Sequence, residues 1–277
     1  MKRYLPAALA ALCLTALSAC APAPAQPTAS PTPAPAVTPA PTPTPVPTPT
    51  PVTEPAEPIL SSQLFAQSYT AEDGTVVLTV SYTLPDFENR DLHPALAAIS
   101  DYYSGEGAEL LTAAGERAES AKGDYEVSTL SGLPFQATAE EMTFETSFQS
   151  EWAICFTRQF YVNSVGAAHP SVFRMAELFD LTDGHRLTFT DCFTDSLAAA
   201  DAAREAVLRS DAAAQLLAQG VSRADIQASF QPEHFYLTGE GFVFWYQPGE
   251  LGAGSSPVEL PVPYSALKEY LVEWIAS

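Results

Sequence analysis

A run of prolines near the N-terminus sets the first limit on what this chain can fold into. Between Ala21 and Pro58, fifteen of the 38 residues are proline, and most of the others are alanine, threonine or valine. Proline has no backbone N–H donor and holds φ near −65°, so such a segment favours solvated polyproline II over helix or sheet. We therefore expect an extended linker, with a reach of roughly 120 Å at about 3.1 Å per residue.

The residues before this linker have the pattern of a secretion signal that ends at a lipid attachment site. Lys2 and Arg3 give a positive start, and the apolar run from Leu5 to Leu17 is too short to span about 30 Å of hydrocarbon comfortably. Small residues then lead into Cys20, as they do at a lipoprotein cleavage and acylation site. An ordinary secretory signal that is cut near the same position is the alternative.

This pattern predicts three segments. Residues 1–19 form the lipoprotein signal peptide, residues 20–58 comprise the lipidated Cys20 and the Pro/Thr-rich linker, and residues 59–277 form the folded domain. The expected location is extracytoplasmic, with lipid at Cys20 anchoring the protein to the bacterial cell membrane.

The charge of the chain is strongly unbalanced. Its 33 acidic and 12 basic residues give a net charge of −21, and loss of Lys2 and Arg3 with the signal leaves ten basic residues and about −23. Such a field repels nucleic acid, which we therefore do not expect as a partner, and attracts cationic proteins, peptides and metal ions. Solubility outside the cell is the alternative explanation of the acidity.

Two cysteines remain for the folded domain once Cys13 is removed and Cys20 is acylated. Cys155 and Cys192 could pair in an oxidising compartment. Each lies in an apolar, strand-like stretch, however, so we expect two buried free thiols. The sequence contains no CxxC pair and no zinc-ligand spacing, and we expect no metal site.

The folded region alternates strand patterns with helical ones, and this predicts a single compact α+β domain with a mainly antiparallel sheet. Asp-Gly pairs at residues 73–74 and 183–184 predict two tight hairpin turns. The expected strands are residues 64–70, 75–83, 143–148, 151–164, 172–180, 185–190, 235–237, 242–246 and 258–262.

Four helices are expected in the same region. The first spans about Asp91 to Lys122, with an interruption around Gly105 to Gly107. The second begins after Thr194 or Asp195 and continues until Gly220, and a short third begins at Ser222. An amphipathic helix with four apolar residues on one face closes the chain: Leu267, Leu271, Trp274 and Ile275.

Two stretches carry a family pattern in the order and spacing that the pattern requires. The first, from Tyr161 to Phe193, contains Gly-Ala-Ala-His-Pro at residues 166–170, and the second, from Phe235 to Leu267, contains Gln-Pro-Gly-Glu-Leu at residues 247–251. They resemble the extracellular domain of the anti-sigma-V factor, the RsiV type, whose function is otherwise unknown and which also precedes some peptidoglycan deacetylase domains. The resemblance covers about Tyr69 to Leu271.

The resemblance implies a function and two site residues. In the RsiV type the domain is a receptor for lysozyme and also inhibits it, which implies a binding module for a cationic cell-wall-active protein. His169 is then either a hydrogen-bonded anchor of its loop or a group that faces the partner. Glu250 matches the family by position, although the family usually has a tyrosine where this chain has Gly249 and a longer loop after the glutamate.

The sequence also allows a function of another class. A module that binds peptidoglycan, or assists an enzyme that acts on it, is the alternative from a different class. The sequence has no GxSxG elbow, HExxH helix, EF-hand loop or Walker motif, so we expect neither an enzyme nor a cofactor. The aromatic run Phe242 to Tyr246 predicts a central strand covered on both faces, with an aromatic binding platform as the alternative.

Overall fold

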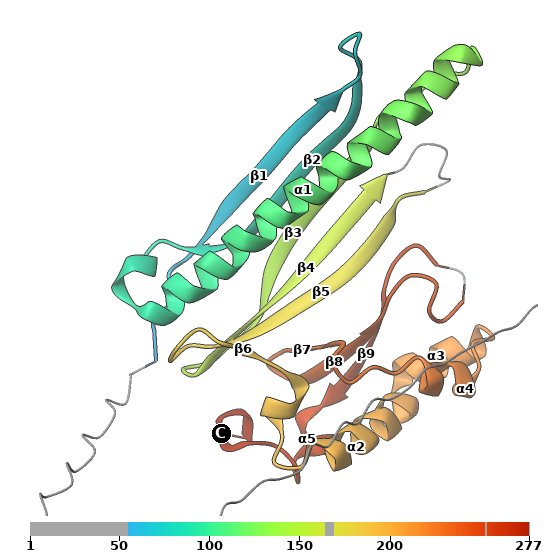
Figure 1. Ribbon diagram of the computed structural model, residues 1–277. Coiled ribbons are helices and arrows are strands. Elements are labelled where there is room, and N and C mark those ends of the chain that lie inside the picture. Colours follow the sequence, from blue (N-terminus) through green and yellow to red (C-terminus); the bar gives the residue numbers. More distant parts are fainter. Residues whose placement is uncertain (1–54, 164–168, 253, 277) are drawn as a thin grey trace, which may run out of the picture. The chain divides into compact units, whose positions relative to one another are not determined.

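The computed structural model describes residues 55–163, 169–252 and 254–276 (Figure 1). They belong to one compact unit, Pro51–Ser277. The predicted signal peptide, Cys20 and most of the predicted linker lie outside the described residues. Within the described ranges, no helix combines the length and apolar character needed to cross a membrane.

A six-stranded sheet forms the larger part of this unit (Figure 1). Its strands are adjacent in chain order, and all neighbours are antiparallel except β2 and β3, which are parallel. They are β1 (Leu60–Thr70), β2 (Val76–Phe87), β3 (Thr138–Gln149), β4 (Ala153–Asn163), β5 (Ser171–Asp180) and β6 (Arg186–Leu187). The predicted fold class, α+β with a mainly antiparallel sheet, is confirmed.

One long helix, α1 (Pro94–Leu130), follows a 3₁₀ turn (Arg90–Leu92) and packs on one face of this sheet (Figure 1). His93 caps its start, because its Nδ1 accepts a hydrogen bond from the Ala95 N–H at 3.2 Å. The interruption predicted near Gly107 is wrong. A Cβ at Gly107 would lie 2.3 Å from the Phe65 ring of β1, so this glycine permits close packing of a continuous helix.

A buried ion pair lies between α1 and the sheet. Both nitrogens of the Arg158 fork bind the Glu177 carboxylate, and the two side chains are 3% and 4% exposed. Tyr103 of α1 donates to the same carboxylate at 3.1 Å, and Glu106 of α1 accepts from Arg158 at 3.1 Å. Burial alone would lower the pKa of Arg158, but the charge and hydrogen bonds of Glu177 outweigh it and raise that pKa.

A second ion pair joins α1 to the sheet further along. Arg117 of α1 binds the buried Glu140 carboxylate with two hydrogen bonds, of 2.6 and 2.7 Å. Tyr82 donates to the same carboxylate at 2.5 Å. Because both glutamates accept one tyrosine and one arginine, their charges are satisfied within the fold.

A smaller, three-stranded sheet packs on part of the large sheet's other face, the one opposite α1. Its apolar side chains form a hydrophobic core separate from the one between α1 and the large sheet. Its strands are β7 (Phe235–Leu237), β8 (Gly241–Tyr246) and β9 (Val258–Pro263), with β8 in the centre. All six residues of β8 are buried. The prediction of a central strand covered on both faces is therefore confirmed, and the aromatic-platform alternative is wrong.

Short helices cover this smaller sheet (Figure 1). Asp195 is the N-cap of α2, since its carboxylate accepts from the Ala198 N–H at 3.1 Å. The second predicted helix is divided, because Ser210 accepts from the Ala213 N–H and caps a new helix. The short helical elements of this part of the chain are a 3₁₀ turn (Phe189–Cys192), α2 (Ser196–Arg209), α3 (Asp211–Ala218), α4 (Arg223–Ala228), α5 (Tyr264–Leu267) and α6 (Glu273–Ala276).

The C-terminal helix, like the second predicted helix, is interrupted where the sequence predicted one continuous helix. The amphipathic pattern of the C-terminal residues predicts one helix, whereas α5 and α6 are separate single turns. Between them Leu271 forms a bridge to Phe193, and the Val272 N–H donates to the Cys192 carbonyl at 3.2 Å. Pairing with this upstream segment replaces the helical hydrogen bonds there.

Both cysteines of the domain are buried and free, as predicted. Burial raises the pKa of Cys155 to about 11 and raises that of Cys192 as well, so both thiols are neutral at pH 8. We expect iodoacetamide at pH 8 to label neither thiol in the native protein and both in urea, as measured by intact mass. Native labelling at the denatured rate would contradict this burial.

Candidate functional site

The two family-like stretches meet at one edge of the large sheet. The Val172 N–H of β5 donates to the Ser255 carbonyl of the β8–β9 loop at 2.7 Å. The Gln247 side chain forms two hydrogen bonds with the backbone of Arg174, two residues further along β5. It accepts from the Arg174 N–H at 3.0 Å and donates to the Arg174 carbonyl at 2.5 Å. Segments some 80 residues apart in sequence are thus joined along β5.

Glu250 organises the turn at the start of the β8–β9 loop. Its Oε2 accepts from the Gln247 N–H at 2.7 Å, and its own N–H donates to the Gln247 carbonyl at 3.1 Å. Gly249 lies inside this turn with a φ of +86°, which glycine adopts without strain. Because the Glu250 carboxylate holds its own loop, its main contribution is to position the loop.

Arg174 of β5 links the large sheet to the small one. Its guanidinium forms an ion pair with Glu259 of β9 at 2.7 Å and lies 5.8 Å from the centre of the Tyr236 ring of β7. Burial, followed by the charge of Glu259, raises the pKa of Tyr236 to about 12. The large and small sheets are therefore joined by a charged contact between β5 and β9.

His169 lies two residues before β5 and is exposed. The preceding Gly-Ala-Ala stretch lies outside the described residues. No hydrogen bond joins the His169 ring to any residue that the structure describes. Its exposure leaves the ring accessible to a partner at the same end of the sheet as the β8–β9 loop.

The small sheet covers only part of the face opposite α1, and the rest of that face is polar and exposed. Side chains alternate along each strand, so the residues between those that pack on α1 point to the opposite side. Cross-strand pairing aligns Ser81, Glu141, Tyr161 and Val172 in one row that ends at the β8–β9 loop. We call this exposed surface the polar sheet face, and its residues are Ser81, Glu141, Thr143, Glu145, Gln159 and Tyr161.

The polar sheet face carries uncompensated negative charge. Glu141 and Glu145 form no salt bridge with any described residue. Seven of the ten basic residues from residue 55 onward are already paired with carboxylates inside the domain: Arg90, Arg117, Lys122, Arg158, Arg174, Arg204 and Arg223. The negative charge of the domain is thus presented outward with few exposed cations near it.

Sequence reasoning found the loops of this region but missed the polar sheet face. The alternation of polar and apolar residues in β3 was available as a signal, with Glu141, Thr143 and Glu145 at every second position. The parallel pairing of β2 with β3 was not predictable from that pattern. It is this pairing that brings Ser81 beside Glu141.

One group of potential metal ligands is present in the described ranges, at the β5–β6 turn. Asp180, Asp183 and His185 each offer one ligand atom within 4.8 Å of the others. Asp180 Oδ1 accepts from the backbone and the hydroxyl of Thr182, at 2.6 and 2.5 Å, and Asp183 Oδ1 lies 2.6 Å from His185 Nδ1. These side-chain contacts account for the cluster as turn structure, and we assign it no metal.

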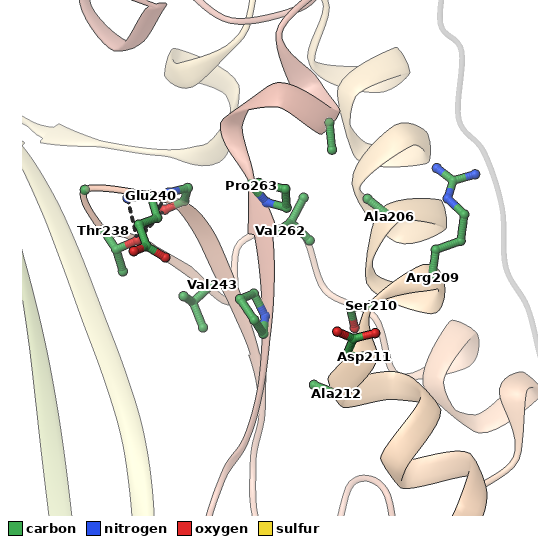
Figure 2. Close-up of a pocket in the computed structure, with 14 residues that line it drawn as sticks. Ala206, Arg209, Ser210, Asp211, Ala212, Thr238, Glu240, Val243, Val262 and Pro263 are labelled. Carbon is green, nitrogen blue, oxygen red and sulfur yellow. Dashed lines mark hydrogen bonds between the residues drawn. The ribbon is translucent and has the colours of Figure 1, made fainter.

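A large groove lies elsewhere, between β9 and the junction of α2 and α3 (Figure 2). It is a groove of about 940 Å³ whose walls are mainly aliphatic and glycine residues. Thr238 at one end accepts from the N–H groups of Glu240 and Gly241, and Arg209 at the other points away from β9 in Figure 2. The described residues that line this groove form no cluster of catalytic groups.

Comparison with known proteins identifies the fold. The chain matches no protein-family model and no curated protein. It is similar to a solved structure of a DUF3298 family member from Bacteroides fragilis, with a TM-score of 0.59 and 15% identity over 80% of this chain and 96% of the other. A DUF3298 family protein from Pseudomonas aeruginosa aligns with a TM-score of 0.47 and 19% identity over 80% and 96% of the chains. The first of these two likenesses shows that the chain has a DUF3298-like fold, and DUF3298 is a domain of unknown function.

Proposed function

We propose that this protein is an extracytoplasmic binding module that recognises a cationic cell-wall-active protein, of which lysozyme is the model, and inhibits it. The observation that carries the proposal is the polar sheet face, whose Glu141 and Glu145 form no salt bridge with any described residue, beside the edge where β5 meets the β8–β9 loop. These two segments belong to the two stretches that resemble the RsiV type. Negative charge concentrated beside shaped loops favours encounter with a basic protein surface.

Each predicted site residue has a place in this proposal. His169 is an exposed contact at the loop before β5, and Glu250 holds the β8–β9 loop in the shape that a partner would meet. Lipid at Cys20 would tether the module to the membrane. The proposal involves binding alone, with no catalytic step, cofactor or nucleic acid.

Calorimetric titration of the unit Pro51–Ser277 with a basic lysozyme tests the proposal, with lysis of bacterial walls followed in parallel. We expect saturable one-to-one binding that slows lysis, with affinity that falls between low salt and about 150 mM salt because exposed charges are screened. Absence of binding at low salt, or binding without any effect on lysis, would overturn the proposal as a whole or its inhibitory part, respectively.

Neutralising the polar sheet face should weaken this binding. We expect Glu141→Gln with Glu145→Gln to lower the affinity about tenfold, mainly through local Coulomb attraction. The matched control is Glu109→Gln with Glu116→Gln, which removes the same charge from exposed positions of α1 on the other side of the sheet. The control should change affinity less than about twofold. Equal effects of the two double variants would show nonspecific attraction by net charge.

A peptidoglycan-binding or enzyme-accessory module remains the second candidate, and one observation favours it. Tyr161 is 36% exposed and is flanked on the polar sheet face by the exposed Gln159 and Thr143, a combination suited to stacking and hydrogen bonding with sugar. Binding of isolated glycan strands should depend little on salt and should be lost in Tyr161→Ala. Salt-sensitive binding of lysozyme without glycan binding would exclude this candidate.

A further inference from the structure

The described sheet edges differ in how they are protected. The free side of β5 is occupied by the Ser255 carbonyl, by the Gln247 side chain and by β6. The edge strand β9 carries Pro261 and Pro263 and lies beside α2 and α3. Proline and covering segments are the usual means by which proteins prevent edge-to-edge pairing. Strand β1 contains no proline, and no segment that the structure describes covers its outer edge.

The outer edge of β1 presents a regular row of backbone groups. The Glu88 N–H donates to the Ile59 carbonyl at 2.9 Å, which marks one hydrogen-bonded pair of the β1–β2 ladder. Such pairs alternate along antiparallel strands. Residues 60, 62, 64, 66 and 68 therefore direct their N–H and C=O groups away from β2, and no described segment pairs with this side.

The composition of β1 is unusual for this chain. Its eleven residues, Leu-Ser-Ser-Gln-Leu-Phe-Ala-Gln-Ser-Tyr-Thr, contain no charge and no proline, although the whole chain has 33 acidic residues. Leu64, at the middle of the outward row, is 65% exposed, and Leu60 is 44% exposed. A long, uncharged edge with exposed leucines is the kind of edge that pairs with another strand.

We propose that β1 is a self-association edge, which pairs antiparallel with β1 of a second copy about a two-fold axis at Leu64. In this register Leu64 faces its own copy, Ser62 faces Ala66, and Leu60 faces Ser68. All five outward residues then form hydrogen-bonded pairs, with about ten backbone hydrogen bonds in total. The two exposed Leu64 side chains meet at the axis, and the two large sheets become continuous. This inference is independent of the proposed partner.

Charge is the reason why a second copy fits this edge. Two copies of the unit Pro51–Ser277, each with 33 acidic and ten basic residues, repel one another overall, so a contact between copies is opposed least at a surface without acidic residues. Strand β1 is such a surface, and its copy has the same length and the same free groups. The dimer should therefore strengthen as salt rises, in contrast to binding of a cationic protein, because screening reduces the mutual repulsion.

Sedimentation of the unit Pro51–Ser277 from about 1 to 500 μM tests the proposal. We expect a monomer–dimer equilibrium with a micromolar dissociation constant, since one strand pair is smaller than a standard interface. Leu64→Lys places like charges face to face and should raise this constant about tenfold or more. The matched control is Leu197→Lys at another exposed leucine, 82% exposed in α2, and it should leave the dimer intact. A monomer at every concentration in high salt, or equal effects of both variants, would overturn the proposal.

The register gives a second, sharper measurement. In Leu64→Cys the two new thiols face each other across the axis and should form an intermolecular disulfide under mild oxidation. In Leu60→Cys they would be eight residues apart along the ladder, about 26 Å at 3.3 Å per residue, and should not. Buried Cys155 and Cys192 serve as an internal background. Equal cross-linking of both variants, or none in Leu64→Cys, would overturn the two-fold register.

Discussion

Replacing Arg158 with methionine should lower the free energy of unfolding by about 3–5 kcal/mol, because it leaves the Glu177 carboxylate buried without its cation. Glu177 is 4% exposed, and among the described residues only the Tyr103 hydroxyl would still donate a hydrogen bond to it. Urea denaturation followed by circular dichroism measures the change. Among single changes in the described residues we expect this to be one of the largest.

Two further variants separate the buried charge from the shape of the side chain. Adding Glu177→Gln to Arg158→Met removes the charge, keeps an acceptor for Tyr103, and should restore at least half of the lost stability. Arg204→Met breaks the exposed pair with Asp201 and should cost less than about 1 kcal/mol. A small loss in Arg158→Met, equal to that in Arg204→Met, would mean that this ion pair does not hold α1 to the sheet.

Replacing Gly184 with alanine should destabilise the domain by about 3 kcal/mol or more, through two effects that add. Its φ of +82° disfavours any side chain with a Cβ. In addition, a Cβ there would lie 2.5 Å from the Ala95 carbonyl oxygen and 2.8 Å from the Ala98 Cβ. The β5–β6 turn therefore packs directly against the first turns of α1.

Gly74 provides a matched control in the same sequence context. It also follows an aspartate in a hairpin turn, with a φ of +86°, but a Cβ there would meet no atom within 4 Å. Gly74→Ala should therefore lose only the conformational part, about 1–2 kcal/mol. Unfolding midpoints in urea compare the two variants. Equal losses would indicate that the backbone near Ala95 relaxes to accommodate the new methyl group.

These two glycines show how far sequence reasoning reached. The Asp-Gly pairs at residues 73–74 and 183–184 predicted both turns, because turn chemistry is local. The contact of Gly184 with α1 depends on where a helix some 90 residues upstream lies, and no local pattern records it. The same reason explains Gly107, which local propensity treats as a helix break and tertiary packing uses for close approach to Phe65.

The helices that were predicted too long have a related explanation. The apolar pattern continues from α2 into α3, so the periodicity alone indicated one helix. The serine at residue 210 was a usable capping signal within it, since its hydroxyl starts α3 by accepting from the Ala213 N–H. At the C-terminus the decisive interaction is non-local, the bridge between Leu271 and Phe193, and it was not predictable.

In the candidate site, too, local motifs indicated some features, whereas others depend on the fold. The motifs located both loops but left open whether His169 anchors its loop or faces a partner, and they did not indicate that the Glu250 carboxylate accepts a hydrogen bond from the Gln247 N–H of its own loop. The polar sheet face required the strand order, because its row of residues comes from β2, β3 and β4. Composition indicated that the chain is acidic, and the fold determined where that charge is unpaired.

The direction in which the chain enters the sheet has a mechanical consequence. The described chain joins the sheet at Leu60, opposite Phe87, whereas the last residue of β4, Asn163, lies at the other end, near the Tyr69 end of β1. A pulling force between Leu60 and the end of β4 would run along the strands. The hydrogen bonds between β1 and β2 would then be sheared together, which resists extension far better than opening them one after another.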